Sequence, residues 1–279
     1  MTSVRGWASQ LLLRAPAPLR SLRNAPCGIG ALIHRWSHRV VPADEKVWAQ
    51  VESGPAEGLW LRLNPRTGQH YLRGYAEAAT QNILVSHLRP GMVFYDLGAN
   101  IGLFSMLGAR LVGLRGKVFS FEPDLEVAQR LRENADRNGF TNITVVASGV
   151  WSSTGMLEFH AAEASSPDHG TGKFAVGGGG RLTHCISLDD FVETQAPPDA
   201  IKCDVEGAEV EVLRGARRTL AVHKPWVLCE THSSETQSDS HAILRELGYT
   251  IQMIDPFHLF AHSAGKDDVD LAELWPCDK

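Results

Sequence analysis

The fold of this 279-residue chain is decided by the stretch Met92-Val93-Phe94-Tyr95-Asp96-Leu97-Gly98-Ala99-Asn100-Ile101-Gly102. Residues 92–97 are mostly apolar and predict a strand, and residues 101–111 show the spacing of a helix. A glycine-bearing loop that follows a strand and opens a helix is where open α/β sheets bind their ligands. The stretch therefore predicts such a sheet, with a ligand site at this loop.

The rest of the chain continues the alternation of strands and helices. A helix is predicted at 76–88, ahead of the loop. After the loop, the predicted strands are 117–121, 143–147, 200–203, 226–229, 249–254 and 258–261. The predicted helices between them are 125–138, 208–221 and 238–247. Alternation at this length predicts a doubly wound, mostly parallel α/β sheet with helices on both faces.

We divide the chain into three segments. Residues 1–42 are a basic segment, 43–90 an appendage, and 91–279 the sheet domain. Within the appendage, 43–57 predicts a short helix and a linker, and 58–73 predicts a hairpin because turn residues interrupt two apolar runs.

The segment 149–187 interrupts the rhythm of the sheet domain. Residues 150–151 and 156–160 predict a hairpin across the turn residues between them. The glycine-rich stretch 161–181 predicts a surface loop, since no strand leads directly into it.

The segment 1–42 carries six arginines and no acidic side chain, with leucines and prolines interleaved. This composition is typical of a transit peptide, of an amphipathic segment on a membrane surface, or of a poorly ordered tail, which we favour. No apolar run reaches 18 residues, so no membrane-spanning helix is predicted. We expect a cytoplasmic protein, with organelle targeting or weak membrane-surface contact through 1–42 as the alternatives.

Charge and cysteine content argue against several classes of protein. The formal net charge of −5 does not fit a chain built to coat nucleic acid, so no nucleic-acid partner is expected. The five cysteines include no Cys-x-x-Cys pair, and neither a disulfide framework nor a zinc site is predicted.

Asp96 stands where the first glycine of a dinucleotide-binding Gly-x-Gly-x-x-Gly loop would be. A carboxylate there would repel a pyrophosphate at the helix N-terminus, and it would suit a cationic ammonium group. Gly98 and Gly102 lack side chains, so the backbone can pass close to such a ligand.

Glu122 follows the next strand, about twenty residues after the loop, where an acidic side chain can accept hydrogen bonds from ribose hydroxyls. NAD-binding enzymes share this device, so Glu122 alone indicates only a ribose. Asp96 and Glu122 together indicate an amino acid joined to a nucleoside, which describes S-adenosylmethionine.

A third group of polar residues ends the strand 200–203. Lys202, Asp204 and Glu206 alternate along an extended segment, so their side chains share one face. The carboxyl end of this strand adjoins the switch point of a doubly wound sheet, which places these residues near the ligand loop.

These motifs resemble the FkbM family of methyltransferases. The resemblance rests on Asp96 to Gly102, on Phe121-Glu122-Pro123, on Ser187-Leu188-Asp189-Asp190 and, most specifically, on the stretch from Ile201 to Ala216. It implies a class I methyltransferase fold of seven strands, one of them antiparallel, and S-adenosylmethionine as methyl donor. It also implies donor-binding roles for Asp96, Gly98, Asn100, Gly102 and Glu122, with Ser148 and Gly149 near the adenine. Most family members are assigned as O-methyltransferases of natural products or sugars.

Methylation of a hydroxyl needs a group that accepts its proton. Asp204 is the first candidate for this catalytic base, Glu206 the second, and His232 the third. No metal is predicted, although paired carboxylates also suit a divalent cation. The acceptor is expected to be a small molecule such as a sugar, a lipid or a secondary metabolite, and the sequence does not indicate the oligomeric state.

Two other functions stay open on the sequence alone. One is an NAD-dependent oxidoreductase, against which Asp96 argues. The other is a non-catalytic nucleoside-binding protein on the same scaffold. A nucleic-acid methyltransferase is less expected, because no Asn-Pro-Pro-Tyr motif occurs.

Overall fold

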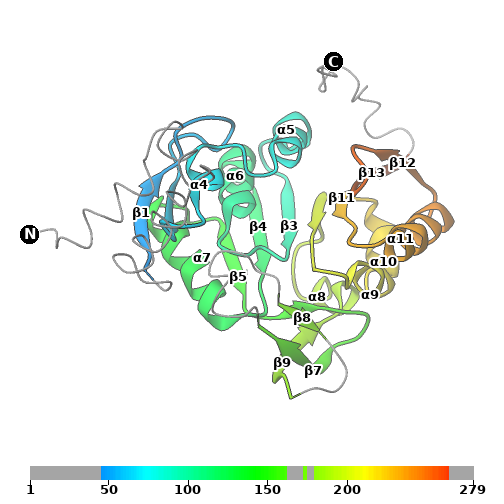
Figure 1. The fold of residues 1–279 in the computed structure, drawn as a ribbon. Coiled ribbons are helices and arrows are strands. Elements are labelled where there is room, and N and C mark those ends of the chain that lie inside the picture. The colour runs from blue at the N-terminus through cyan, green and yellow to red at the C-terminus, as the bar shows by residue number, and fades with distance from the viewer. Residues whose placement is uncertain (1–44, 162–171, 175–178, 264–279) are drawn as a thin grey trace, which may run out of the picture. The chain divides into compact units, whose positions relative to one another are not determined.

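The computed structural model describes residues 45–161, 172–174 and 179–263 (Figure 1). The basic segment 1–42 and most of the predicted loop 161–181 lie outside these ranges. The described chain forms two compact units, which divide at residue 78. Among the helices of the described ranges, none combines the length and the apolar character that crossing a bilayer requires.

The second unit is built on a seven-stranded sheet with the order β12-β13-β11-β10-β3-β4-β5. Its strands are β3 (Val93–Leu97), β4 (Lys117–Phe121), β5 (Ile143–Val146), β10 (Ala200–Cys203), β11 (Trp226–Glu230), β12 (Tyr249–Met253) and β13 (His258–Ser263). β13 runs antiparallel to both of its neighbours, and the other pairs are parallel. The predicted doubly wound sheet with one antiparallel strand is therefore confirmed.

The central strands β3 and β10 fix the place of the ligand site. They are hydrogen-bonded neighbours, with Asp96 opposite Lys202 and Leu97 opposite Cys203. From β3 the sheet continues to β4 on one side, and from β10 it continues to β11 on the other. The strand order thus reverses between them, and open sheets bind ligands beyond the carboxyl ends of strands at such a switch point.

Helices cover this sheet and connect its strands. They are α5 (Ala78–His87), α6 (Leu103–Val112), α7 (Leu125–Arg137), α8 (Leu188–Phe191), α9 (Glu209–Arg214), α10 (Arg217–His223) and α11 (Ser234–Glu246). Asp124 caps the N-terminus of α7, because its side chain accepts the N–H groups of Glu126 and Val127. α6 packs closely on β3, since a Cβ on Gly108 would lie 2.5 Å from the ring of Phe94.

Aromatic rings fill the core on one side of the sheet. Tyr95, Phe119, Phe121 and Phe191 have ring centroids 4.9 to 5.7 Å apart and meet mostly edge to face. The hydroxyl of Tyr95 donates to the carbonyl of Ala196 at 2.7 Å. This packing holds β3 and β4 rigidly beneath the loops that follow them.

The helix predicted at 208–221 is instead two helices, α9 and α10. The chain turns at Gly215, where a Cβ would lie 2.1 Å from the carbonyl oxygen of Trp151. α10 then begins anew, because the side chain of Asp189 accepts the N–H groups of Arg218 and Thr219. The apolar spacing continues through this break, which is why the sequence predicted one helix.

The hairpin predicted from 150–151 and 156–160 is wrong. β6 (Gly149–Val150) and β7 (Gly155–His160) both pair with β9 (Arg181–Ile186), which lies between them. β8 (Lys173–Phe174) completes a four-stranded sheet in the order β6-β9-β7-β8. The prediction failed because a strand thirty residues further along the chain displaces the local pairing.

The first unit also differs from the prediction. Residues 47–50 form a strand, β1 (Val47–Gln50), rather than part of a helix, and β1 pairs antiparallel with β2 (Trp60–Leu63). The turn residues 64–68 are followed by a short helix, α4 (Gln69–Leu72). The N–H of Gly68 donates to the carbonyl of Asn64, which closes a helical turn ahead of α4. The hairpin is therefore 47–63, not 58–73, and the segment boundaries proposed at 42 and 90 stay predictions.

Candidate functional site

The glycine loop after β3 is shaped by contacts within the chain. Gly98, Asn100 and Gly102 have φ values of 76°, 47° and 89°. A Cβ on Gly98 would lie 1.7 Å from the carbonyl oxygen of Asp204, and one on Gly102 would lie 2.7 Å from Leu131. The glycines are thus required by packing of the protein against itself, in addition to any close approach of a ligand.

Asp96 is fully buried at the end of β3 rather than open to solvent. Its Oδ2 accepts a hydrogen bond from Ser105 at 2.5 Å, and its Oδ1 lies 4.0 Å from Lys202 Nζ. Burial raises the pKa of this carboxyl above its ordinary value. Asp96 is therefore an interior carboxyl group beneath the loop, next to Lys202, and its predicted contact with the donor stays a prediction.

Glu122 ties the glycine loop to the loop after β4. Its Oε2 accepts the N–H of Asn100 at 3.0 Å, and its Oε1 accepts the N–H of Asp124 at 2.9 Å. The side chain is buried, and burial raises its pKa to about 7 despite these hydrogen bonds. One carboxylate thus fixes the spacing of both loops at the switch point.

Ser148 and Gly149 lie just beyond the carboxyl end of β5. Ser148 is buried, and its Oγ is 3.0 Å from the carbonyl oxygen of His184. A Cβ on Gly149 would lie 2.3 Å from the ring of Phe174. Both residues therefore belong to the junction between the large sheet and the four-stranded sheet, and their predicted contacts with an adenine stay a prediction.

Asp204 lies directly beside the glycine loop. Its N–H donates to the carbonyl of Leu97 at 3.0 Å, which continues the β3–β10 ladder beyond the strands. Its Oδ2 accepts from Lys202 Nζ at 3.1 Å. Because Lys202 is also paired with Asp96, one buried ammonium group joins the carboxylate under the loop to the carboxylate beside it.

His232 follows β11 and brings the three predicted catalytic residues together. Its Nε2 is 3.5 Å from Glu206 Oε2 and 3.7 Å from Asp204 Oδ1. Its Nδ1 is 2.8 Å from Glu209 Oε1, and this hydrogen bond is the main reason that the pKa of His232 rises to about 9. At neutral pH the ring is therefore an imidazolium facing a partly exposed carboxylate pair.

Comparison with known proteins decides the family. The family model of the methyltransferase FkbM domain matches residues 96–251, which are more than half of the chain. Hexuronic acid methyltransferase AglP of Haloferax volcanii is 34% identical over 193 residues, which are 68% of this chain and 73% of AglP. The chain belongs to the FkbM family of methyltransferases. Its methyl donor is S-adenosylmethionine, and the predicted family and cofactor are confirmed.

Solved structures with a related arrangement include two methyltransferases. FkbM from Methylobacillus flagellatus KT is 25% identical with a TM-score of 0.45, over 62% of this chain and 44% of that one. Fibrillarin from Aeropyrum pernix, crystallised with natively bound S-adenosyl-L-methionine, is 16% identical with a TM-score of 0.43, over 66% of this chain and 72% of that one. The chain thus spans less than half of the first of these structures.

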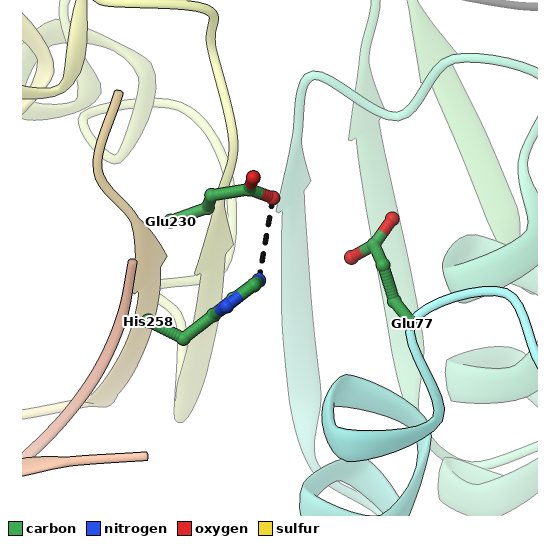
Figure 2. Close-up of side chains that lie close together, drawn as sticks. All are labelled: Glu77, Glu230 and His258. Atoms are coloured by element: carbon green, nitrogen blue, oxygen red, sulfur yellow. Dashed lines mark ion pairs between the residues drawn. The ribbon is translucent and has the colours of Figure 1, made fainter. Parts of the chain in front are cut away.

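A second histidine of this FkbM methyltransferase adjoins the same cluster. Figure 2 shows His258, at the start of β13, directed at Glu230 at the end of β11. His258 Nε2 is 3.3 Å from Glu230 Oε2, and its Nδ1 is 2.9 Å from Asp255 Oδ2. Burial opposes the charge of His258, but the bonds to both carboxylates outweigh it and raise the pKa to about 9.

Three residues of the cluster were not predicted from the sequence: Glu209, Glu230 and His258. Glu209 was visible within the family's Glu-Gly-Ala-Glu motif, and Glu230 stands two positions before His232. His258 carries no local signal, because only the antiparallel pairing of β13 with β11 places it opposite Glu230.

Oxygen or nitrogen atoms of Asp204, Glu230 and His232 all lie within 4.8 Å of one another, close enough to share a divalent cation. Carboxylates and a histidine gather in this way in many sites without a metal. The expected absence of a metal therefore stays a prediction for this FkbM methyltransferase.

Proposed function

We propose that this chain moves the methyl group of S-adenosylmethionine to a hydroxyl oxygen of a sugar-type small molecule, with Asp204 as the proton acceptor. Support for the acceptor class comes from AglP, whose name describes a hexuronic acid methyltransferase. Support for the base comes from one observation: Asp204 contacts the glycine loop through its backbone and holds its carboxylate between Lys202 and His232.

The residues around the switch point fit this donor. We assign its binding to Asp96, Gly98, Asn100, Gly102 and Glu122, with Ser148 and Gly149 near the adenine. Among the described residues, the buried Oδ1 of Asp96 accepts no hydrogen bond, and Lys202 lies 4.0 Å away. A buried carboxylate oxygen with so little compensation favours a positive charge nearby, as a methionine ammonium or sulfonium provides.

When bound, the donor supplies a methyl group on a sulfonium, which is already a good leaving group. The protein must hold the acceptor hydroxyl in line and remove its proton. Asp204 suits this task because its backbone contacts the glycine loop and its carboxylate lies between Lys202 and His232. Glu206 lies two residues beyond the contact with the glycine loop and faces His232 at 3.5 Å, and His232, whose pKa is raised to about 9, already carries a proton at neutral pH.

Replacing Asp204 tests the assignment. We expect Asp204→Asn to lower turnover about 100-fold or more, because positioned proton acceptors contribute factors of that size. Affinity for S-adenosylhomocysteine, measured by calorimetry, should change little. The assay uses labelled donor with a panel of hexuronic acids, neutral hexoses, lipids and polyketides.

Two results would count against this function. Full turnover by Asp204→Asn would remove it as the base and leave Glu206 or His232. Wild-type protein that binds S-adenosylhomocysteine but methylates no hydroxyl compound would favour the non-catalytic alternative. A cytoplasmic location and weak membrane contact through 1–42 stay proposals.

A further inference from the structure

Glu209 is a fully buried carboxylate at the first position of α9. Its Oε1 is 2.8 Å from the backbone N of Gly207 and 2.8 Å from His232 Nδ1. A buried charge is costly unless it is paired and hydrogen-bonded. The His232 ring, which comes from the end of a different strand, is the cation that compensates Glu209.

This contact decides which ring nitrogen of His232 faces the site. A carboxylate oxygen only accepts hydrogen bonds, so Nδ1 must carry a proton. Nε2 is left on the opposite side of the ring, where it lies 3.5 Å from Glu206 and 3.7 Å from Asp204. Without Glu209, nothing in these contacts would prefer one orientation of the ring over its flipped form.

We propose that Glu209 is a positioning residue for methyl transfer, which holds the His232 ring so that Nε2 faces the proton-accepting carboxylate of Asp204. The proposal rests on the proposed function, because it gives His232 a role through Asp204. Glu209 and His232 then belong to a chain of alternating charges that links α9 to the donor loop. Its members in order are Glu209, His232, Asp204, Lys202 and Asp96.

Charged groups from several elements face His232. Asp204 and Glu206 face it from the loop after β10, Glu209 from α9 and Glu230 from β11. His258 shares Glu230 with it, and Lys202 shares Asp204. The hydrogen bond from His232 to Glu209 contributes most to keeping the ring cationic, so loss of the Glu209 charge should make the ring lose its proton at lower pH.

The first test uses wild-type protein and needs no activity. Protein labelled with 15N and 13C at histidine is titrated by NMR, and the His232 signal is assigned by its loss in His232→Gln. We expect His232 to titrate near pH 9 and its neutral form to carry the proton on Nδ1. A neutral ring protonated on Nε2, or an ordinary imidazole titration, would overturn the proposal.

The second test compares Glu209→Gln with Glu211→Gln. Glu211 lies on the same helix and its carboxylate pairs with Arg214, so it is a matched control. We expect Glu209→Gln to lower kcat by roughly 10- to 100-fold, as loss of positioning does. The alkaline limb of its pH–rate profile should move down by about one pH unit or more, while the KM for the donor stays the same.

The outcomes separate the proposal from a structural role and from the proposed function. If Glu209→Gln loses stability but keeps the wild-type pH profile and kcat, Glu209 is only structural and the proposal fails. If the variant does not fold, the wild-type titration still decides. If wild-type protein methylates no acceptor although His232 titrates as expected, the proposed function fails while the placement of His232 by Glu209 stands.

Discussion

At the scale of single residues, the site depends on close approach between two loops. Gly98 passes so near the carbonyl of Asp204 that even a methyl group has no room. The same residue has a positive φ, a backbone conformation that residues with a Cβ rarely adopt. The donor loop and the proposed base are therefore held in one arrangement by backbone contact rather than by side chains alone.

Replacing Gly98 by alanine should separate the loops and damage the protein. We expect Gly98→Ala to lose on the order of 3 kcal/mol of unfolding free energy and to weaken S-adenosylhomocysteine binding strongly. Gly139→Ala is the matched control, since Gly139 has a φ of 74° but open space around its missing Cβ. Chemical denaturation measures the unfolding free energy of both variants. Equal losses of unfolding free energy would show that the backbone conformation, and not the contact with Asp204, requires glycine at position 98.

At the scale of elements, α8 and α10 are joined through one carboxylate. Asp189 Oδ1 accepts from the backbone N and the hydroxyl of Thr219 at 2.7 Å each, and Oδ2 accepts from Arg218 N at 2.9 Å. α8 itself is capped by Ser187, whose side chain accepts the N–H of Asp190. The Ser-Leu-Asp-Asp motif thus caps two helices: Ser187 caps α8, and Asp189 caps α10.

Removal of the Asp189 cap should lower the stability of the protein without changing the residues of the candidate site. We expect Asp189→Ala to lower the unfolding free energy by about 1 to 2 kcal/mol, as lost helix caps do. Glu193→Gln removes only an exposed ion pair with Arg218 and should change stability little. Thermal unfolding measures both, and an unchanged melting temperature in Asp189→Ala would mean that α10 does not need the cap.

The elements also show what sequence alone can predict. β4 and β10 were predicted with their observed bounds because they are short apolar runs buried within a parallel sheet. The pairing of β6 with β9 escaped prediction because it joins Gly149 to Cys185, far along the chain. For the site, local motifs predicted Asp204 and Glu206, whereas the roles of Glu209 and His258 depend on contacts between strands and helices.

At the scale of the whole molecule, the strand order collects charge at one end of the sheet. The carboxyl ends of β3, β10 and β11 and the start of β13 bring carboxylates and cations together, although β3 and β10 are separated by about a hundred residues in the chain. Two of those cations are histidines whose pKa is raised to about 9 by carboxylate partners. Folding therefore binds protons that the unfolded chain would release near an ordinary imidazole pKa of about 6.5.

This proton binding makes stability depend on pH in a defined direction. A raised pKa contributes stability fully below the unfolded value near 6.5, and the contribution is lost as pH rises through about 9. We expect the unfolding free energy to fall by roughly 1 kcal/mol per pH unit between pH 7 and 9, after allowing for solvent screening of the partly exposed rings. Glu122, with its pKa raised to about 7, adds to the loss only in the lower part of that range. Urea unfolding at several pH values measures the slope, and the double variant His232→Gln, His258→Gln should flatten it. A wild-type slope that the double variant retains would show that neither histidine is held as a cation in the folded protein.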